Sequence, residues 1–493
     1  MANYYIKTER RFSIIRKFGW LFTVLVGIGG LFEPKLGLLV IPVILALTVM
    51  GFFRGRYWCG NFCAHGSLFD SLFIPFGRNA KIYRFMKSKY MTIGFMTFFA
   101  FNLSRKIMGA AQFWGENSFL DKLGFVFVTT YLMVIIVGGG LSMVNSGRTW
   151  CQVCPMGVME KISYKLGKIT KANKKTDVKV TISDKDACHK CGKCARVCPM
   201  QISPYTEFNE SNQFDSSNCI KCSTCVVNCP AGILSIEKEE KAIELKAISA
   251  EKRASLANEV PGRQHIEAEV VEVNELGPDL REFKFQFKSP KRVAYKPGQF
   301  MILKIEAEPE SYRAYSISGW DPKGSTVGVI IKKVADGYGT EKIFDDYTLG
   351  AKVELEGPLG DELVVDKNAK KLLFIGNGIG ITPFIPLVED AILNRPDSLE
   401  RIDLVYGIRK SEDLIYDEFF SKQDIESDMF NYHKIASREE IHGRKGYVMD
   451  VIKDLDVSDS KVYICGSKAM VNDTVKLLKE NGLSEQDIFV ETA

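Results

Sequence analysis

Apolar residues follow two different patterns along the chain. In the first third they form four continuous runs, over residues 12–32, 36–53, 90–103 and 123–145. The last run, LGFVFVTTYLMVIIVGGGLSMVN, is long enough to cross a bilayer core of about 30 Å, whereas the run at 90–103 is short for that purpose. These runs predict an α-helical bundle of about four transmembrane helices within residues 1–165.

The second pattern begins near residue 263. The segments IEAEVVEVNEL, REFKFQF, QFMILKIEA and TVGVIIKKVA alternate at the spacing of antiparallel strands, which predicts a β-barrel domain over residues 263–364. From KKLLFIGNGIGITPFIPLVEDAI onward, buried strands alternate with helices, which predicts an α/β domain with a parallel sheet over 365–493. Between the two patterns lie a cysteine-rich domain at 166–236 and a charged, semi-rigid helical linker at 237–262.

Positive charge is concentrated beside the apolar runs. The first 90 residues carry 13 Lys and Arg against three acidic residues, although the whole chain has a net charge of only +5. Basic segments stay on the inner side of a membrane, so we predict a multi-pass protein of a prokaryotic cytoplasmic membrane, with its other domains in the cytoplasm. The expected partner of this charge is a lipid bilayer rather than nucleic acid. No cleavable signal peptide is expected, and the sequence indicates no oligomeric state.

Twelve of the thirteen cysteines occur at CxxC or CxxxC spacing, which indicates bound metal in a reducing compartment. Four of them follow the second and fourth apolar runs: Cys59, Cys63, Cys151 and Cys154. The predicted orientation brings these four to one membrane face, where four thiolates suit an iron–sulfur cluster or zinc. The alternative is free cysteines, with Trp58 and Trp150 as ordinary residues of an interfacial aromatic belt.

Two further runs have the spacing of a bacterial two-cluster ferredoxin. Residues 188–199 read CHKCGKCARVCP and residues 219–230 read CIKCSTCVVNCP, each a C-x2-C-x2-C-x3-C-P pattern. In this arrangement the fourth cysteine of each run binds the other cluster. One [4Fe–4S] cluster is expected on Cys188, Cys191, Cys194 and Cys229, and the other on Cys219, Cys222, Cys225 and Cys198. Zinc is the weaker alternative, because zinc sites do not usually need eight cysteines in this repeated form.

Residues 10–235 resemble the polyferredoxin-like membrane proteins that accompany periplasmic nitrate reductases and nitrous-oxide reduction systems. That family carries two CxxxCP motifs after paired transmembrane helices, followed by ferredoxin-type clusters. The resemblance implies a third iron–sulfur cluster at the membrane face. Here the first pair, CGNFCA, has Ala64 in place of proline, and the second is CxxCP, so the type of cluster stays open.

Residues 263–493 resemble the ferredoxin–NADP reductase superfamily, through the motifs RAYSIS, GYGT, GNGIGITP and CGSKAM. The resemblance implies FAD, rather than FMN, together with NAD(P)H. It implies that Arg313 pairs with the flavin pyrophosphate, that Tyr315 packs on the isoalloxazine ring, and that Ser316 makes a hydrogen bond near N5 of that ring. The GYGT segment is expected to receive phosphate through Gly337, Gly339 and Thr340.

The same resemblance assigns the nicotinamide nucleotide site. Its loop residues are Gly376, Gly378, Gly380, Thr382 and Pro383. CGSKAM resembles the family's CGPxxM, with Ser467 in place of proline, so Cys465 and Gly466 are expected at the nicotinamide; a buried strand cysteine is the alternative. Tyr315, Ser316 and Cys465 are the expected catalytic residues. Ser437 and Arg438 lie where NADPH-using relatives place 2′-phosphate ligands, and Arg409 and Arg444 add nearby cations. Similar residues occur in NADH-using members, so NADH and NADPH both stay open.

The order of these parts predicts an oxidoreductase. Electrons would pass from NAD(P)H through FAD and two [4Fe–4S] clusters to the membrane-face cluster, and then to a quinone or to a membrane or extracytoplasmic redox protein. Reverse flow that reduces NAD(P)+ is an alternative, because direction depends on reduction potentials. A non-enzymatic electron-transfer or maturation factor for a partner enzyme is the other alternative.

Overall fold

The computed structural model describes residues 4–256, 262–307, 310–335, 337–360, 363–366, 368–395 and 398–492. The chain forms two compact units, Met1–Lys252 and Arg253–Ala493. Residues 257–261 of the expected linker lie outside the described residues. The rest of that linker is largely one helix, α12 (Glu239–Leu256), in agreement with its predicted helical character.

Among the described residues, three helical stretches are long and apolar enough to cross a membrane: Ile14–Leu31, Pro34–Arg54 and Phe119–Val144. They contain α1 (Ile14–Phe18), α2 (Trp20–Gly27), α3 (Val40–Arg54), α7 (Phe119–Met133) and α8 (Gly139–Val144). Many of their apolar side chains face outward: Leu45 is 67% exposed and Ile136 is 65% exposed. Such a surface is unfavourable in water and is typical of a lipid-facing helix bundle.

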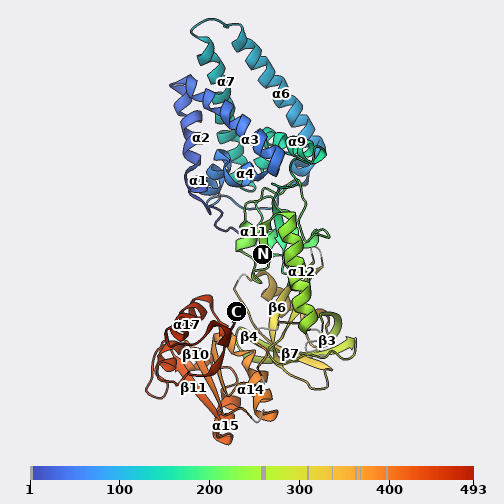
Figure 1. Ribbon diagram of the computed structural model, residues 1–493, viewed down its shortest axis with the longest axis vertical. Helices are drawn as coiled ribbons and strands as arrows, with labels where there is room; N and C mark the ends of the chain where they lie inside the picture. The colour runs from blue at the N-terminus through green and yellow to red at the C-terminus, as the bar shows by residue number, and fades with distance from the viewer. Residues whose placement is uncertain are drawn as a thin grey trace. The chain divides into compact units, whose positions relative to one another are not determined.

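The short apolar run expected at 90–103 lies inside a longer helix, α6 (Lys89–Ala111), beside α7 (Figure 1). Ser88 caps this helix, because its hydroxyl accepts a hydrogen bond from the N–H of Met91 at 3.1 Å. The helix then continues through the polar segment that begins at Asn102, which lowers its apolar character below that of the other three. The four predicted helices therefore all form, but length and apolar character together support three membrane spans.

The membrane-face cysteines lie on short elements at the ends of these helices. The first pair lies around α4 (Tyr57–Asn61) and α5 (Ala64–Leu68). The second pair lies at a single 3-10 turn and at the start of α9 (Pro155–Ile169). Helix α3 packs against α9, which brings the segments that carry the two pairs together.

A small cysteine-rich fold completes the first unit. Its strands β1 (Lys179–Ile182) and β2 (Leu234–Glu237) pair antiparallel, and its short helices are α10 (Lys193–Arg196) and α11 (Thr224–Val227). Val180, Ile182, Phe214 and Leu234 form its few buried apolar contacts. With so small a core, ligand binding must contribute much of its folding energy.

The second unit begins with a closed six-stranded antiparallel barrel, as predicted. Its strand order is β3-β4-β7-β6-β5-β8. The strands are β3 (Gln264–Gly277), β4 (Leu280–Ser289), β5 (Phe300–Ala307), β6 (Glu310–Gly319), β7 (Thr326–Lys332) and β8 (Lys352–Leu359), with α13 (Tyr338–Asp346) between β7 and β8. Alternate side chains of these strands fill the barrel with a continuous apolar core.

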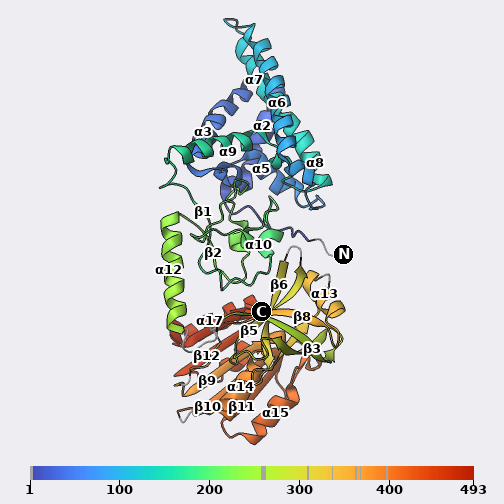
Figure 2. The same ribbon diagram turned by 90° about the vertical axis from the view of Figure 1, so that its right-hand side faces the viewer.

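The remainder of the second unit is the predicted α/β fold, with a five-stranded parallel sheet in the order β11-β10-β9-β12-β13 (Figure 2). The strands are β9 (Lys371–Asn377), β10 (Arg401–Ile408), β11 (Phe430–Ala436), β12 (Ser460–Gly466) and β13 (Ile488–Thr492). The helices are α14 (Phe384–Leu393), α15 (Asp417–Glu426), α16 (Val448–Ile452) and α17 (Lys468–Glu480). The strand order reverses between β9 and β12, so the loops that follow these two strands meet at a crevice, the usual ligand position in such sheets.

Candidate functional site

The expected flavin residues lie on strand β6 of the barrel. Tyr315 and Ser316 pair in register with residues of β5. Arg313 reaches the start of α13, where a Cβ added to Gly339 would lie 2.9 Å from its Nε. Burial raises the pKa of Tyr315 to about 12, so its phenol is neutral at physiological pH.

The GYGT segment provides backbone N–H groups beside Arg313. Gly337 precedes α13, whose first residue is Tyr338. The Thr340 hydroxyl accepts a hydrogen bond from the N–H of Val334 at 3.0 Å, which closes the loop that leads into the helix. A helix N-terminus beside a guanidinium is suited to an anionic group, so these residues fit the pyrophosphate of FAD.

The glycine-rich loop after β9 lies against the end of β12. Gly376 pairs with Cys465 in the sheet register, and a Cβ added to Gly380 would lie 2.4 Å from the carbonyl oxygen of Cys465. The Thr382 hydroxyl donates to the carbonyl of Ile379 at 2.7 Å, and Pro383 precedes α14. The two sequence motifs, far apart in the chain, therefore form one surface at the crevice.

Asn377 joins these two motifs, and sequence reasoning did not identify it. Its Oδ1 accepts a hydrogen bond from the backbone N–H of Ser467 at 2.9 Å. A proline at position 467, as in the related CGPxxM motif, has no N–H and could not make this bond. Serine in place of the motif's proline thus allows a hydrogen bond that proline could not make. The sequence feature that could have indicated this bond is the asparagine between Gly376 and Gly378.

A cavity of about 1020 Å³ lies at this crevice. Of the residues expected to bind nucleotide, Gly378, Arg409 and Ser437 line it. Among the described residues of its wall, neither Arg438 nor Cys465 is present; Arg438 is held through a backbone hydrogen bond to Arg409. Cys465 is 2% exposed, and burial, with the charge of Glu491, raises the pKa of its thiol well above the usual value.

We expect Gly380→Ala to weaken nucleotide binding selectively. The added methyl group would meet the backbone of Cys465, so the nucleotide loop must shift away from the end of β12, and KM for the nicotinamide nucleotide should rise about tenfold or more while FAD content stays constant. Gly262→Ala is the control, because its Cβ meets no atom within 4 Å and it lies outside this junction. Steady-state kinetics should leave its KM unchanged; an unchanged KM in Gly380→Ala as well would contradict the expectation.

The two ferredoxin-type runs adopt the same loop conformation. Lys190 (φ 46°) and Lys221 (φ 52°) occupy equivalent positions, as do Gly192 (φ 65°) and Ser223 (φ 61°), and all four are left-handed. This conformation is unfavourable for the three residues that are not glycine. Each run therefore curls in the same way around its cysteines, and the strain is concentrated at these positions.

The structure brings together the two cysteine sets that the spacing predicted. Burial raises the pKa of Cys194, and the other three members of its set, Cys188, Cys191 and Cys229, lie close enough to raise it further. Cys198, Cys219 and Cys222 act in the same way on Cys225, and these four line one small cavity. The raised pKa of Cys194 and Cys225 keeps these buried thiols protonated unless a cation compensates the thiolate charge, so both sets fit a bound metal cluster. Across the described residues, no three His, Cys, Asp or Glu side chains meet closely enough to hold a single metal ion.

All four membrane-face cysteines line a second cavity, of about 310 Å³. Its wall also contains Arg56, Arg148 and Glu160, which are almost fully buried and which sequence reasoning did not select. Burial raises the pKa of Glu160 to about 7, and its Oε2 accepts a hydrogen bond from the Cys59 thiol at 2.7 Å. The signal that could have identified the arginines is the repeated Arg-x-Trp-Cys order before each cysteine pair.

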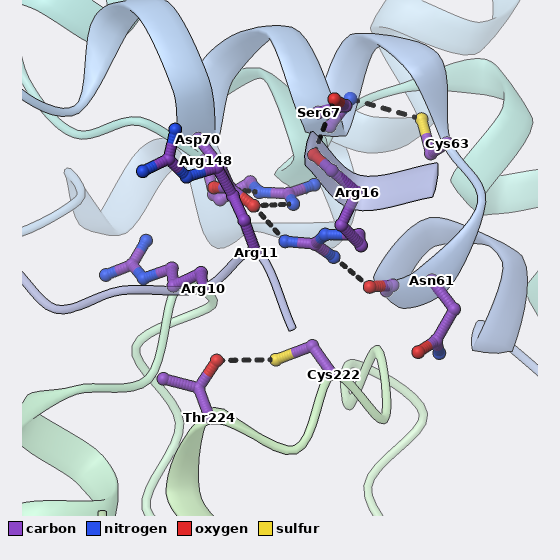
Figure 3. Close-up of polar contacts among 12 residues, drawn as sticks. Arg10, Arg11, Arg16, Asn61, Cys63, Ser67, Asp70, Arg148, Cys222 and Thr224 are labelled. Atoms are coloured by element: carbon purple, nitrogen blue, oxygen red, sulfur yellow. Dashed lines mark hydrogen bonds and ion pairs between the residues drawn. The ribbon is translucent and has the colours of Figure 1, made fainter. Parts of the chain in front are cut away.

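The cysteine set Cys198, Cys219, Cys222 and Cys225 adjoins the membrane-face site. Cys59, Cys151 and Trp150 pack in one core with Met200 and Ile220 of the ferredoxin-type fold. The Asn61 amide donates to the carbonyl of Lys221 at 3.2 Å, and Figure 3 shows Asn61 and Cys222 on facing sides of this junction. Cys194, the buried member of the other cysteine set, is not part of this core and packs in a separate one.

Four family models match separate parts of the chain. An oxidoreductase FAD-binding domain matches residues 267–362, and an oxidoreductase NAD-binding domain matches residues 374–476. A 4Fe-4S dicluster domain matches residues 180–230, and a 4Fe-4S binding domain matches twice, at 36–83 and 126–173. The chain is therefore an NAD(P)H-dependent oxidoreductase with FAD-binding, NAD-binding and 4Fe–4S domains, which confirms those predicted cofactor classes.

Several oxygenase reductases are similar to part of the chain. The ferredoxin–NAD(P)+ reductase component of a naphthalene 1,2-dioxygenase system from Pseudomonas putida is 29% identical over 46% of this chain and 68% of its own length. The propane 2-monooxygenase reductase component of Rhodococcus jostii is 24% identical over 62% of this chain and 80% of its own length. The chain spans 57% of the glycine betaine monooxygenase reductase subunit of Chromohalobacter salexigens, at 26% identity over 41% of this chain. A cytochrome P450 reductase structure from Amycolatopsis is 25% identical, with a TM-score of 0.43 over 47% of this chain and 71% of its own.

Proposed function

We propose that the protein is a membrane-bound oxidoreductase that moves electrons from NAD(P)H, through FAD and two [4Fe–4S] clusters, to a third iron–sulfur cluster at the membrane face. A quinone or a membrane redox protein is the final acceptor. Cys59, Cys63, Cys151 and Cys154 hold the third cluster. The expected cytoplasmic-membrane location and the resemblance to polyferredoxin-like membrane proteins are part of the same proposal.

One observation carries this proposal. The four membrane-face cysteines line a single cavity, and the core around that cavity also contains Met200 and Ile220, which flank cysteines of the second ferredoxin set. Both halves of this membrane-face region match a 4Fe-4S binding domain. Close packing without intervening solvent is what a chain needs if it is to hold two redox groups near one another.

When bound, FAD takes two electrons from NAD(P)H and releases them singly to iron–sulfur clusters, which carry one electron each. The residues of this chain bind and position these groups. Arg313 and the N-terminus of α13 would hold the FAD pyrophosphate, and the Asn377–Ser467 hydrogen bond would align the nucleotide loop with the end of β12. Trp150 and Ile220, both buried, exclude water between the ferredoxin-type fold and the membrane-face cysteines.

The membrane-face cavity favours a lipid-soluble acceptor. Besides the cysteines, its wall is built largely from apolar side chains of the candidate spans, among them Phe22, Val40, Leu47 and Val134. These residues come from α2, α3 and the stretch that follows α7, so the apolar part of the wall lies at membrane depth if the spans insert. The third cluster would occupy the cysteine end of this cavity, so a quinone ring would approach the cluster along the apolar part of the wall.

The direct test uses the full chain in lipid nanodiscs. We expect about one FAD and about ten to twelve cluster irons per chain, depending on whether the third cluster has two or four irons. NADH or NADPH should reduce a quinone added to the discs, and comparison of the two nucleotides identifies the donor. NAD(P)H oxidation that supports a soluble dye but no quinone from a panel of benzoquinones and naphthoquinones would contradict a quinone acceptor.

A second candidate function is electron delivery to an oxygenase, and the similarity to oxygenase reductase components favours it. In that case the acceptor receives electrons from the ferredoxin-type fold, and the membrane-face cysteines are not needed. The two functions therefore differ in their dependence on Cys59 and Cys151.

A further inference from the structure

The two membrane-face cysteine segments form an internal repeat that extends beyond the cysteines. In each, an arginine stands two residues before a tryptophan that precedes the first cysteine, and a glycine follows the second cysteine by three positions. The first copy is Arg56, Trp58, Cys59, Cys63 and Gly66, and the second is Arg148, Trp150, Cys151, Cys154 and Gly157. Nothing in the proposed function uses the arginines or the glycines.

The side chain of each arginine contacts the cysteine segment of the other copy of the repeat. Arg56 Nη2 donates to the carbonyl oxygen of Cys151 at 3.0 Å and lies 3.8 Å from Cys59 Sγ. Arg148 Nη1 lies 3.5 Å from the carbonyl oxygen of Cys59 and 3.7 Å from Cys151 Sγ. Both guanidinium groups therefore face the first cysteine of both copies, in a reciprocal arrangement.

The repeated glycines leave space for the two guanidinium groups. A Cβ added to Gly66 would lie 2.5 Å from Arg148 Nη1, and a Cβ added to Gly157 would lie 2.7 Å from Arg56 Nη2. The guanidinium groups thus occupy the space that a side chain would fill. A shared spatial reason explains why both copies have glycine at this position.

Two more arginines are buried nearby, so that positive charge exceeds negative charge in this region. The buried arginine group consists of Arg10, Arg16, Arg56 and Arg148, each at most 4% exposed. The buried carboxyl groups beside it are Asp70 and Glu160. Asp70 alone pairs with two of the arginines, as Figure 3 shows: it accepts from Arg148 Nη2 at 2.6 Å and from Arg16.

Several donors of this group have no acceptor in the protein. Within the described part of the chain, Arg56 Nε and Nη1 and Trp150 Nε1 are buried without a hydrogen-bond partner, as are Arg10 Nε and Nη1. Buried cations and buried N–H groups without partners are strongly unfavourable. Four thiolates around a metal centre carry net negative charge and several acceptor sulfurs. They would therefore supply both the negative charge and the hydrogen-bond acceptors that this region needs.

We infer that Arg56 and Arg148 are the counter-charges of the metal group held by the four membrane-face cysteines, and that they raise its reduction potential. This inference rests on the third cluster of the proposed function. A reduced cluster carries one more negative charge than an oxidised one, so a nearby cation stabilises the reduced form more. The two arginines act on the cluster through charge and N–H donation, and are positioning residues rather than catalytic ones.

The test is a redox titration of the full chain, followed by electron paramagnetic resonance of each cluster, with metal analysis. In Arg56→Gln and Arg148→Gln, the ratio of reduced to oxidised membrane-face cluster at a fixed potential should fall at least about tenfold, which equals about 59 mV for a one-electron couple. The other two clusters should titrate as in the wild type. Arg54→Gln is the matched control, because this arginine lies two residues from Arg56 but packs over the Tyr57 ring. In this variant the ratio of reduced to oxidised membrane-face cluster should change less than about twofold.

Arg56→Lys and Arg148→Lys separate charge from packing. If a glutamine variant loses its metal, retention of metal in the lysine variant supports the counter-charge role, and loss in both overturns it. Glutamine variants that keep their metal and titrate within about twofold of the wild type also overturn it. Zinc without a redox signal in the wild type would refute the proposed third iron–sulfur cluster, and zinc loss confined to the glutamine variants would still support the counter-charge role.

Discussion

The double substitution Cys59→Ser and Cys151→Ser is expected to lower NAD(P)H:quinone reductase activity at least about a hundredfold, because one ligand is removed from each half of the four-cysteine site. NAD(P)H:ferricyanide reductase activity should stay within about twofold of the wild type, since FAD and the ferredoxin-type clusters are held by other residues. Iron content should fall by the two to four irons of one cluster. Both activities are measured on the same nanodisc preparation.

The ferricyanide reaction is the internal control for folding and flavin loading. Wild-type quinone reduction in the double variant would refute an electron path through the membrane face and would favour the oxygenase-reductase function. Loss of both activities with loss of FAD would indicate a folding failure; the single variant Cys59→Ser, examined by the same two assays and by iron analysis, then carries the test.

Gly60→Ala is expected to separate the ferredoxin-type fold from the membrane-face site. A Cβ at this position would lie 1.8 Å from the carbonyl oxygen of Ile220, within the CIKC loop of the second ferredoxin run. The Gly60 carbonyl also accepts a hydrogen bond from Arg16, so α4 is held from both sides and cannot move away without breaking that bond. The loop must therefore shift. Electron transfer between the second ferredoxin cluster and the membrane-face cluster slows as their separation grows, so quinone reduction should fall severalfold while ferricyanide reduction is unchanged.

Gly109→Ala is the matched control, because Gly109 lies in α6 and its added Cβ would meet no atom within 4 Å. It should leave both activities unchanged. Iron content separates the possible outcomes for Gly60→Ala: all clusters should be retained, and only the rate of reduction of the membrane-face cluster should fall in stopped-flow measurements. An unaffected rate would show that contact between Gly60 and Ile220 is not part of the electron path.

Local patterns in the sequence were sufficient to predict most elements. The alternation of REFKFQF predicts a barrel strand because each side chain's direction depends only on its neighbours in the strand, and β4 (Leu280–Ser289) forms there. The same is true of the cysteine runs, whose left-handed residues Lys190 and Lys221 set the loops from within. The apolar run at 90–103 is shorter than the helix that forms there, α6, because the helix continues into polar residues beyond the run.

The sequence alone did not identify the residues that act across long separations. Asn377 belongs to the nucleotide site because Ser467, ninety residues later, donates to it. Cys465 matches a nicotinamide motif, yet the fold buries its side chain in the sheet core. Arg438 and Arg409 are joined by a backbone hydrogen bond, yet of these two only Arg409 lines the cavity.

The sequence by itself determined the chemical classes of this protein: thiolate ligands at cluster spacing, glycine-rich loops for phosphates, and apolar runs long enough for a membrane. These properties depend on residues within about one helical turn or one loop of each other, where covalent geometry already limits the conformations. Only the tertiary structure decided which ferredoxin-type cysteine set adjoins Cys59 and Cys151, and that Arg56 and Arg148 each contact the other repeated segment. Those relations depend on burial, which removes water from charges far apart in the chain and makes their pairing obligatory.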